Sequence, residues 1–98
     1  MLDQAAILST LARHRDELRS LGAQRLSLFG SYARNTANDA SDVDVLVELQ
    51  PKTLDSYMEL KFRLEELLGC PVDLVLRDGL KATVADSVLR EAIDEPGS

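Results

Sequence analysis

Residues 41–49 read Ser-Asp-Val-Asp-Val-Leu-Val-Glu-Leu, and this stretch decides the fold. From Asp42 to Leu49, valine or leucine stands at every second position, which is typical of a β-strand with one buried face. Pro51 follows and ends the strand, because proline has no N–H to donate to a neighbouring strand. The aspartates at the start are unusual, since aspartate is a poor strand former and burying an unpaired carboxylate is costly. We therefore expect a strand whose first residues serve a site.

The apolar pattern on either side of this strand predicts three helices and two further strands. The helices are expected at 3–21, 54–68 and 80–93, the other strands at 25–29 and 72–76, and a loop or short helix at 32–41. Asp3 is an expected N-cap for the first helix. The order predicts a single α+β (or α/β) domain over residues 1–94, with helices flanking a short three-stranded sheet. We expect residues 95–98 to form a disordered tail. The apolar pattern does not determine the directions of the strands.

Composition narrows the class of protein. The chain has 98 residues, 45% of them hydrophobic and 29% charged, as in an ordinary globular domain. The net charge of −6 argues against binding of long nucleic acid, which requires clustered lysine and arginine. No apolar run approaches the roughly 20 residues needed to cross a bilayer. With a single cysteine and no basic, apolar leader, we expect a cytoplasmic protein that does not engage a membrane.

Three aspartates on neighbouring predicted strands form a candidate metal site. Asp42 and Asp44 are two residues apart, so both side chains leave the same face, with Cα atoms about 6.6–6.8 Å apart. Asp73 interrupts the apolar run of the next strand and comes alongside if the two strands pair. Three carboxylates in one patch repel each other unless a cation lies between them. One or two Mg²⁺ ions suit such oxygen ligands, and one aspartate could accept a proton from a substrate hydroxyl.

A candidate phosphate site, made of four residues, precedes the aspartates in the sequence. Gly30 allows close approach of a phosphate and a positive φ, and Ser31 offers a hydroxyl and a backbone N–H. Arg34 follows one helical turn later and could reach the same phosphates. Ser41 either bonds a phosphate or caps the turn before Asp42.

Gly30 and Ser31, ten further residues and then Asp42-Val43-Asp44 make a G-S-x10-D-x-D signature. This signature, with Arg34 and the later Asp73, resembles the minimal nucleotidyltransferases of the DNA polymerase β superfamily. The resemblance implies a nucleotidyltransferase fold with a mixed sheet. It also implies that the aspartates ligate the metal, with Asp73 as the third carboxylate and possible base, and that the Gly-Ser pair holds the triphosphate. Asn35 replaces the family's usual glycine, and asparagine also tolerates a left-handed conformation.

The resemblance further implies a function. These proteins are usually encoded beside a HEPN-domain RNase toxin, and they silence it by transferring AMP from ATP to a tyrosine of the toxin. We therefore expect a Mg²⁺-dependent adenylyltransferase antitoxin that forms a complex with a HEPN partner. An alternative is an antitoxin that binds the toxin without catalysis. A third possibility is a nucleotidyltransferase that acts on a small molecule.

Four other residues have structural or docking interpretations. His14 lies on the apolar stripe of the first helix, and Cys70 precedes a buried strand, so both are expected to pack rather than react. Met58 and Phe62 are four residues apart on the face of the 54–68 helix that lies away from its leucines. They either pack under a loop or form a small exposed patch where the partner protein docks.

Overall fold

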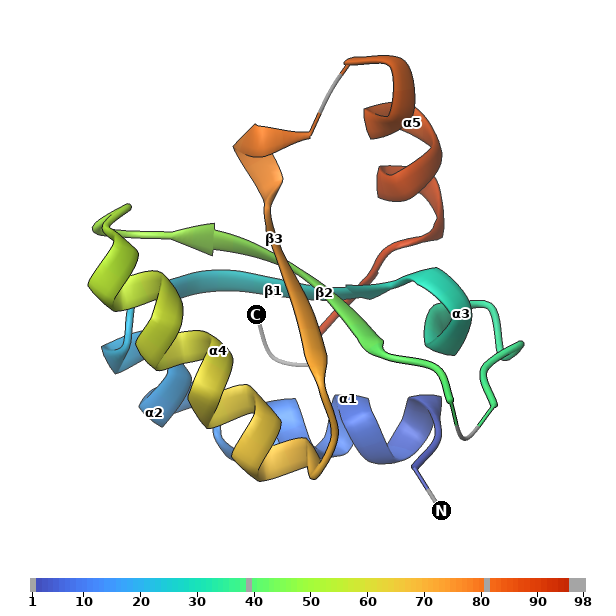
Figure 1. Ribbon diagram of the computed structural model, residues 1–98, viewed down its shortest axis with the longest axis horizontal. Helices are drawn as coiled ribbons and strands as arrows, with labels where there is room; N and C mark the ends of the chain where they lie inside the picture. The colour runs from blue at the N-terminus through green and yellow to red at the C-terminus, as the bar shows by residue number, and fades with distance from the viewer. Residues whose placement is uncertain (1, 39, 81, 96–98) are drawn as a thin grey trace.

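The computed structural model describes residues 2–38, 40–80 and 82–95, and for 82–84 the backbone alone (Figure 1). Along the chain its elements are α1 (Gln4–Arg13), α2 (Arg15–Ser20), β1 (Ala23–Phe29), α3 (Gly30–Ala33), β2 (Val43–Leu49), α4 (Leu54–Leu68), β3 (Val72–Leu76), the 3-10 turn η1 (Arg77–Gly79), α5 (Ala82–Glu91) and β4 (Ile93–Asp94). No helix within the described residues is long and apolar enough to span a membrane.

The strands form one mixed sheet in the order β3-β2-β1-β4. β1 pairs antiparallel with both β2 and β4, whereas β2 pairs parallel with β3. The predicted mixed sheet is confirmed, but it has a fourth strand that the sequence did not predict. β4 has only two residues, which is too short to show the alternation by which strands are predicted.

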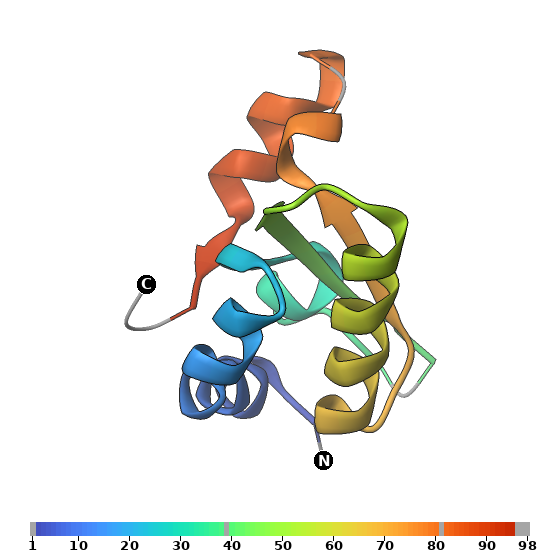
Figure 2. The ribbon, with the colours of Figure 1, turned by 90° about the vertical axis from the view of Figure 1, so that its left-hand side faces the viewer.

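Helices α1, α2 and α4 cover one face of the sheet, and α5 stands on the other side (Figures 1 and 2). The first face carries the core, because the alternate residues of β2 point into it from Val43 to Leu49. On the helices, this core includes Ile7, Leu11, Leu18, Leu60 and Leu64. Leu46 points to the opposite face and is also fully buried.

The single helix predicted at 3–21 is wrong: two helices meet at His14. Its backbone leaves the helical region, with φ −108° and ψ 17°. The break turns the chain, and both helices still bury their apolar side chains, Ile7 and Leu11 in α1 and Leu18 in α2. The predicted N-cap is confirmed, because the Asp3 carboxylate accepts the backbone N–H of Ala6 at 2.8 Å. His14 is half-buried, with Nδ1 2.9 Å from the Thr10 carbonyl oxygen, which supports its structural interpretation.

The last predicted helix also ends earlier than expected, at Glu91, and the chain then returns along β1 as β4. Asp94 fixes this return, because its carboxylate accepts from the Arg25 guanidinium at 2.8 Å and from the Ser27 hydroxyl at 2.5 Å. Glu95, which we placed in the tail, is buried and donates its backbone N–H to the Leu26 carbonyl at 3.0 Å. Residues 96–98 lie outside the described chain.

Candidate active site

The sheet brings three segments of the signature to one edge. β1 runs antiparallel to β2, and β2 runs parallel to β3, so the end of β1 meets the starts of β2 and β3. Phe29 pairs with Asp44 across one side of β2, and Asp44 pairs with Asp73 across the other. Gly30 follows Phe29 directly and begins α3. The glycine and two of the aspartates are therefore neighbours at this edge.

The carboxyl group of Asp44 has a raised pKa. Burial is the main cause that raises its pKa to about 6, and the charge of Asp73, a hydrogen bond with Asp73 and the charge of Asp42 add to the effect. The guanidinium of Arg34 acts in the opposite direction. Asp42 lies just before β2, and both Asp42 and Asp73 are exposed. Asp44 and Asp73 therefore lie side by side on paired strands, and Asp42 lies just before the start of β2.

The aspartates do not form a closed ligand set. Among residues 2–38, 40–80 and 82–95, no three histidine, cysteine, aspartate or glutamate side chains are grouped so that they could hold a metal ion. The donor chemistry nevertheless suits a hard cation, because carboxylate oxygens are the ligands that Mg²⁺ prefers. A cation would also relieve the repulsion that, after burial, contributes to the raised pKa of Asp44. The metal role of Asp42, Asp44 and Asp73 stays a prediction.

Gly30 is fixed by its contact with Asp44. Its φ is +74°, and a Cβ at this position would overlap Oδ2 of Asp44 and lie 2.9 Å from Cγ. The Cα of Gly30 is therefore held directly beside the carboxylate. Ser31 is half-buried next to it, and its carbonyl accepts the Thr36 N–H at 2.9 Å. Asn35 has a φ of +59°, so asparagine does adopt the left-handed conformation here.

Glu91, at the end of α5, reaches this edge of the sheet and was missed by the sequence reasoning. Its Oε1 accepts the Gly30 N–H at 3.3 Å. Arg34 Nη1 donates to both carboxylate oxygens at 3.1 Å. The predicted phosphate ligands Gly30 and Arg34 are thus bonded to a protein carboxylate. No local pattern reveals this, because 61 residues separate Gly30 from Glu91.

Ser41 caps the turn before Asp42, which was one of its two predicted roles. Its hydroxyl accepts the Asn38 N–H at 3.0 Å, and its own N–H donates to the Asn38 carbonyl at 2.9 Å. A hollow of about 570 Å³ opens beside this turn and is lined in part by Ser41, Asp42, Tyr32 and Pro71. That size is typical of small-molecule sites. Contact of Ser41 with a phosphate stays a prediction.

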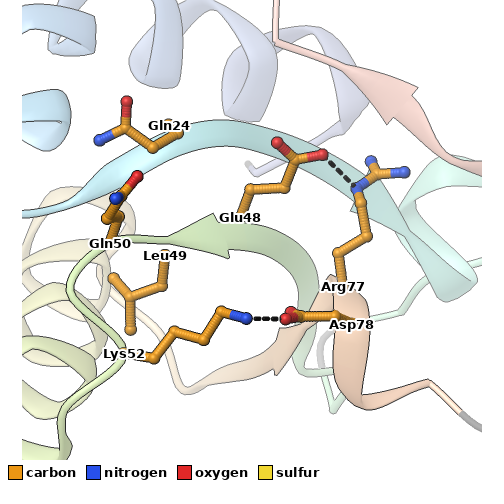
Figure 3. Close-up of a pocket in the computed structure, with 7 residues that line it drawn as sticks. All are labelled: Gln24, Glu48, Leu49, Gln50, Lys52, Arg77 and Asp78. Carbon is orange, nitrogen blue, oxygen red and sulfur yellow. Dashed lines mark hydrogen bonds and ion pairs between the residues drawn. The ribbon is translucent and has the colours of Figure 1, made fainter.

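A second hollow, of about 530 Å³, lies at the far end of β2, where Glu48 and Arg77 face each other (Figure 3). Arg77 Nε is 3.7 Å from Glu48 Oε1, and Lys52 forms an ion pair with Asp78. The charges of these four side chains are therefore paired within the hollow. It is also separated from Asp44 by about 13 Å, the length of four residues of strand. The edge with the aspartates remains the candidate active site.

The predicted docking residues lie on the outer side of α4. Phe62 is 54% exposed and Met58 is half-buried. Leu54, one turn before Met58, is 74% exposed and extends the row, although the sequence reasoning did not single it out. We refer to Leu54, Met58 and Phe62 as the α4 stripe.

Comparisons with known proteins agree with this geometry. The family model for the nucleotidyltransferase domain matches residues 11–95. The chain is 43% identical over 95 residues to the protein adenylyltransferase MntA of Thermococcus cleftensis, covering 95% of this chain and 96% of that protein. A solved structure named as a minimal nucleotidyltransferase has 41% identity and a TM-score of 0.73, covering 94% of this chain and 95% of the other. A crystal structure of a toxin–antitoxin with AMP-PNP has 26% identity and a TM-score of 0.70, covering 99% and 75%.

Proposed function

Since the chain belongs to the nucleotidyltransferase domain family and is a nucleotidyltransferase, we propose that it transfers AMP from ATP to a tyrosine of a HEPN-domain RNase toxin. In this proposal the transfer neutralises the toxin, and the chain acts as its antitoxin. ATP as donor is supported by the similar toxin–antitoxin that was crystallised with AMP-PNP. Protein as acceptor is supported by the name of the Thermococcus cleftensis relative.

The observation that carries the proposal is the packing of Gly30 against Asp44, with Asp73 paired beside it. Nucleotidyl transfer needs phosphate-binding N–H groups next to carboxylates that hold a divalent cation. The left-handed turn at Gly30 presents its backbone N–H at the same edge of the sheet as these two carboxylates. One bound nucleotide could therefore contact both parts of the site.

Each residue then has a distinct task. Gly30 and Ser31 hold the triphosphate, and Arg34 neutralises part of its charge. Asp42, Asp44 and Asp73 would hold one or two Mg²⁺ ions, which when bound offset the negative charge of the phosphates. Asp73 accepts the proton of the acceptor hydroxyl as that oxygen attacks the α-phosphorus. The bond from the α-phosphorus to the bridging oxygen breaks, and pyrophosphate leaves.

The partner protein presents the acceptor tyrosine in a stable complex. We propose that the α4 stripe contributes to this complex, because Leu54 and Phe62 expose apolar surface that a partner could bury. The acidic net charge of −6 fits a protein that recognises another protein rather than a long nucleic acid.

The test follows label from ATP carrying ³²P at the α-phosphate onto the co-purified HEPN partner in the presence of Mg²⁺. We expect labelled partner with the unchanged chain and loss of label by at least about a hundredfold with Asp44→Asn, since metal-site carboxylates are essential to this chemistry. Asp86→Asn, an exposed substitution on α5, is the matched control for loss of one negative charge. Chelation of Mg²⁺ should abolish labelling in both the unchanged chain and the control.

Two other outcomes would favour the alternative functions. Toxin neutralisation that survives Asp42→Asn with Asp44→Asn, without label from any of the four nucleoside triphosphates, would leave an antitoxin that acts by binding. Label that appears on an added small-molecule acceptor but never on the partner would favour a small-molecule nucleotidyltransferase.

A further inference from the structure

We propose that Glu91 is an internal competitor of the nucleotide: its carboxylate occupies the place of a phosphate group at Gly30 and Arg34. The inference rests on the proposed function, because it takes Gly30 and Arg34 as phosphate ligands. It adds a regulatory contact: Glu91 of helix α5 must release Gly30 and Arg34 before a triphosphate binds.

The contacts of Glu91 are those that a phosphate would make. Its Oε1 accepts the Gly30 N–H at 3.3 Å, and both of its oxygens accept from Arg34 Nη1 at 3.1 Å. Phosphates and carboxylates compete for such donors, because both present anionic oxygens to N–H groups and guanidinium ions. A phosphate at these donors would also meet the negative charge of Glu91, and the two anions would repel each other. Phosphate and Glu91 therefore exclude each other at Gly30 and Arg34.

The contact between Glu91 and Arg34 is weak enough to be released. The side chain of Arg34 is 51% exposed and that of Glu91 is 30% exposed, so water screens their attraction. Ion pairs between such exposed side chains contribute little to stability. Glu91 is also the last residue of α5, beyond which the chain leaves the helix. A triphosphate with its metal ion offers Arg34 a stronger partner, so the exchange favours the nucleotide once it is present.

The consequence is a lower apparent affinity for the nucleotide. When only a fraction of the protein has Gly30 and Arg34 free, the apparent dissociation constant rises by the inverse of that fraction. If Glu91 is docked in about 70–90% of molecules, its removal should tighten binding by about three- to tenfold.

The experiment measures binding of AMP-PNP with Mg²⁺ by isothermal titration calorimetry. We expect Glu91→Gln to bind about three- to tenfold more tightly than the unchanged chain. Asp86→Asn is the matched control, because it removes one negative charge from an exposed position of the same helix. We expect its affinity to stay within about twofold of the unchanged chain. Glu91→Asp is the second variant, since it keeps the charge but shortens the reach to Gly30, and it should also tighten binding.

A double-mutant cycle with Arg34→Gln then tests whether Glu91→Gln acts through its contact with Arg34. Because Arg34 holds Glu91 in place, Glu91→Gln should gain less than about twofold in the Arg34→Gln background. Equal or weaker binding by both Glu91 variants would overturn the inference and make Glu91 a helpful part of the site. Equal tightening by Glu91→Gln and Asp86→Asn would overturn it as well, because the effect would be one of net charge.

The label-transfer assay separates this inference from the proposed function. If the unchanged chain labels its partner but the Glu91 variants bind no more tightly, the competitor role alone is wrong. If neither the unchanged chain nor any variant binds AMP-PNP or transfers label, the proposed function is wrong and the inference falls with it.

Discussion

Gly30 lies so close to the carboxylate of Asp44 that no side chain fits between them. A Cβ on Gly30 would overlap Oδ2 of Asp44 and lie 2.9 Å from its Cγ. The contact joins the end of β1 to the start of β2, where the two strands pair antiparallel. It sets the distance between the predicted phosphate site and the predicted metal site.

The first prediction is that Gly30→Ala abolishes transfer and destabilises the fold by about 2–4 kcal/mol, from a left-handed alanine and the clash with Asp44. Gly69→Ala is the matched control, because Gly69 has a φ of +71° and nothing within 4 Å of the added Cβ. It should cost only about 1 kcal/mol and leave transfer intact. Urea denaturation measures both values. Equal losses for the two variants would mean that the clash with Asp44 has no energetic cost.

The second prediction concerns pH and metal-free protein. The pKa of Asp44 is raised from 3.8 to about 6, so the folded protein binds this proton more tightly than the unfolded chain does. Stability should therefore fall as pH rises from about 4 to about 6, and stay lower above that range. Asp44→Asn removes the ionisation. With chelator present, it should melt at a higher temperature than the unchanged chain at pH 7, and the difference should shrink towards pH 4.

Added Mg²⁺ should reverse this order. At pH 7 the cation should raise the melting temperature of the unchanged chain more than that of Asp44→Asn, because ligand binding to the folded state stabilises it. Asp86→Asn again serves as control and should show neither effect. A melting temperature of Asp44→Asn below that of the unchanged chain in chelator would contradict the raised pKa of Asp44, which burial and then the neighbouring aspartates produce.

Sequence alone predicted the parts of the site that local patterns encode. Three segments of the site were predicted from the spacing of Gly30, Asp42 and Asp44 and from the apolar run around Asp73. Strand pairing then brings two of the aspartates together in the structure. The features that were missed depend on contacts between distant residues. Glu91 reaches Gly30 across 61 residues, and β4 is recognised as a strand only because it lies beside β1.

The break at His14 was missed for a different reason. The apolar spacing of Ile7, Leu11 and Leu18 continues through the break, so periodicity predicts one helix. The backbone turns at His14, and the buried residues on both sides keep their contacts with the core. A hydrophobic pattern reports which side chains are buried, whereas it does not report whether the helix axis is straight.

The third prediction tests the α4 stripe. Replacing both Met58 and Phe62 with serine should weaken the complex with the partner by about tenfold or more, because apolar anchors dominate protein interfaces. The free energy of unfolding should change by only about 1 kcal/mol, since Phe62 is 54% exposed. Pull-down and calorimetry with the partner measure the first effect, and urea denaturation the second. Glu59→Ser, on the exposed side of the same helix, is the control.

The alternative interpretation of these residues makes the opposite prediction. If Met58 and Phe62 pack as part of the core, the double variant should unfold at a much lower urea concentration than the unchanged chain. Unchanged partner affinity in a folded double variant would remove the α4 stripe from the interface.

The fourth prediction concerns Asp94, which links β4 to β1. Its carboxylate accepts hydrogen bonds from Arg25 at 2.8 Å and from Ser27 at 2.5 Å. These bonds hold the pKa of Asp94 below its usual range, and the bond with Arg25 has the larger effect. Asp94→Ala should destabilise the fold by about 1–2 kcal/mol at pH 7, at the low end for charged hydrogen bonds because the side chain is 46% exposed. A lowered pKa means that this contribution is present above pH 4 and is lost as the pH falls below it.

Asp78→Ala is the matched control for Asp94→Ala, because Asp78 forms an ion pair with Lys52 at the surface. It should cost much less stability than Asp94→Ala, because exposed ion pairs usually contribute little. Because α5 lies between Gly79 and β4, loosening β4 also loosens the hold of Glu91 on Gly30 and Arg34. Asp94→Ala should therefore tighten binding of AMP-PNP as well as lower stability, whereas Asp78→Ala should leave binding unchanged. A loss of stability without any gain in affinity would show that β4 does not hold Glu91 in place.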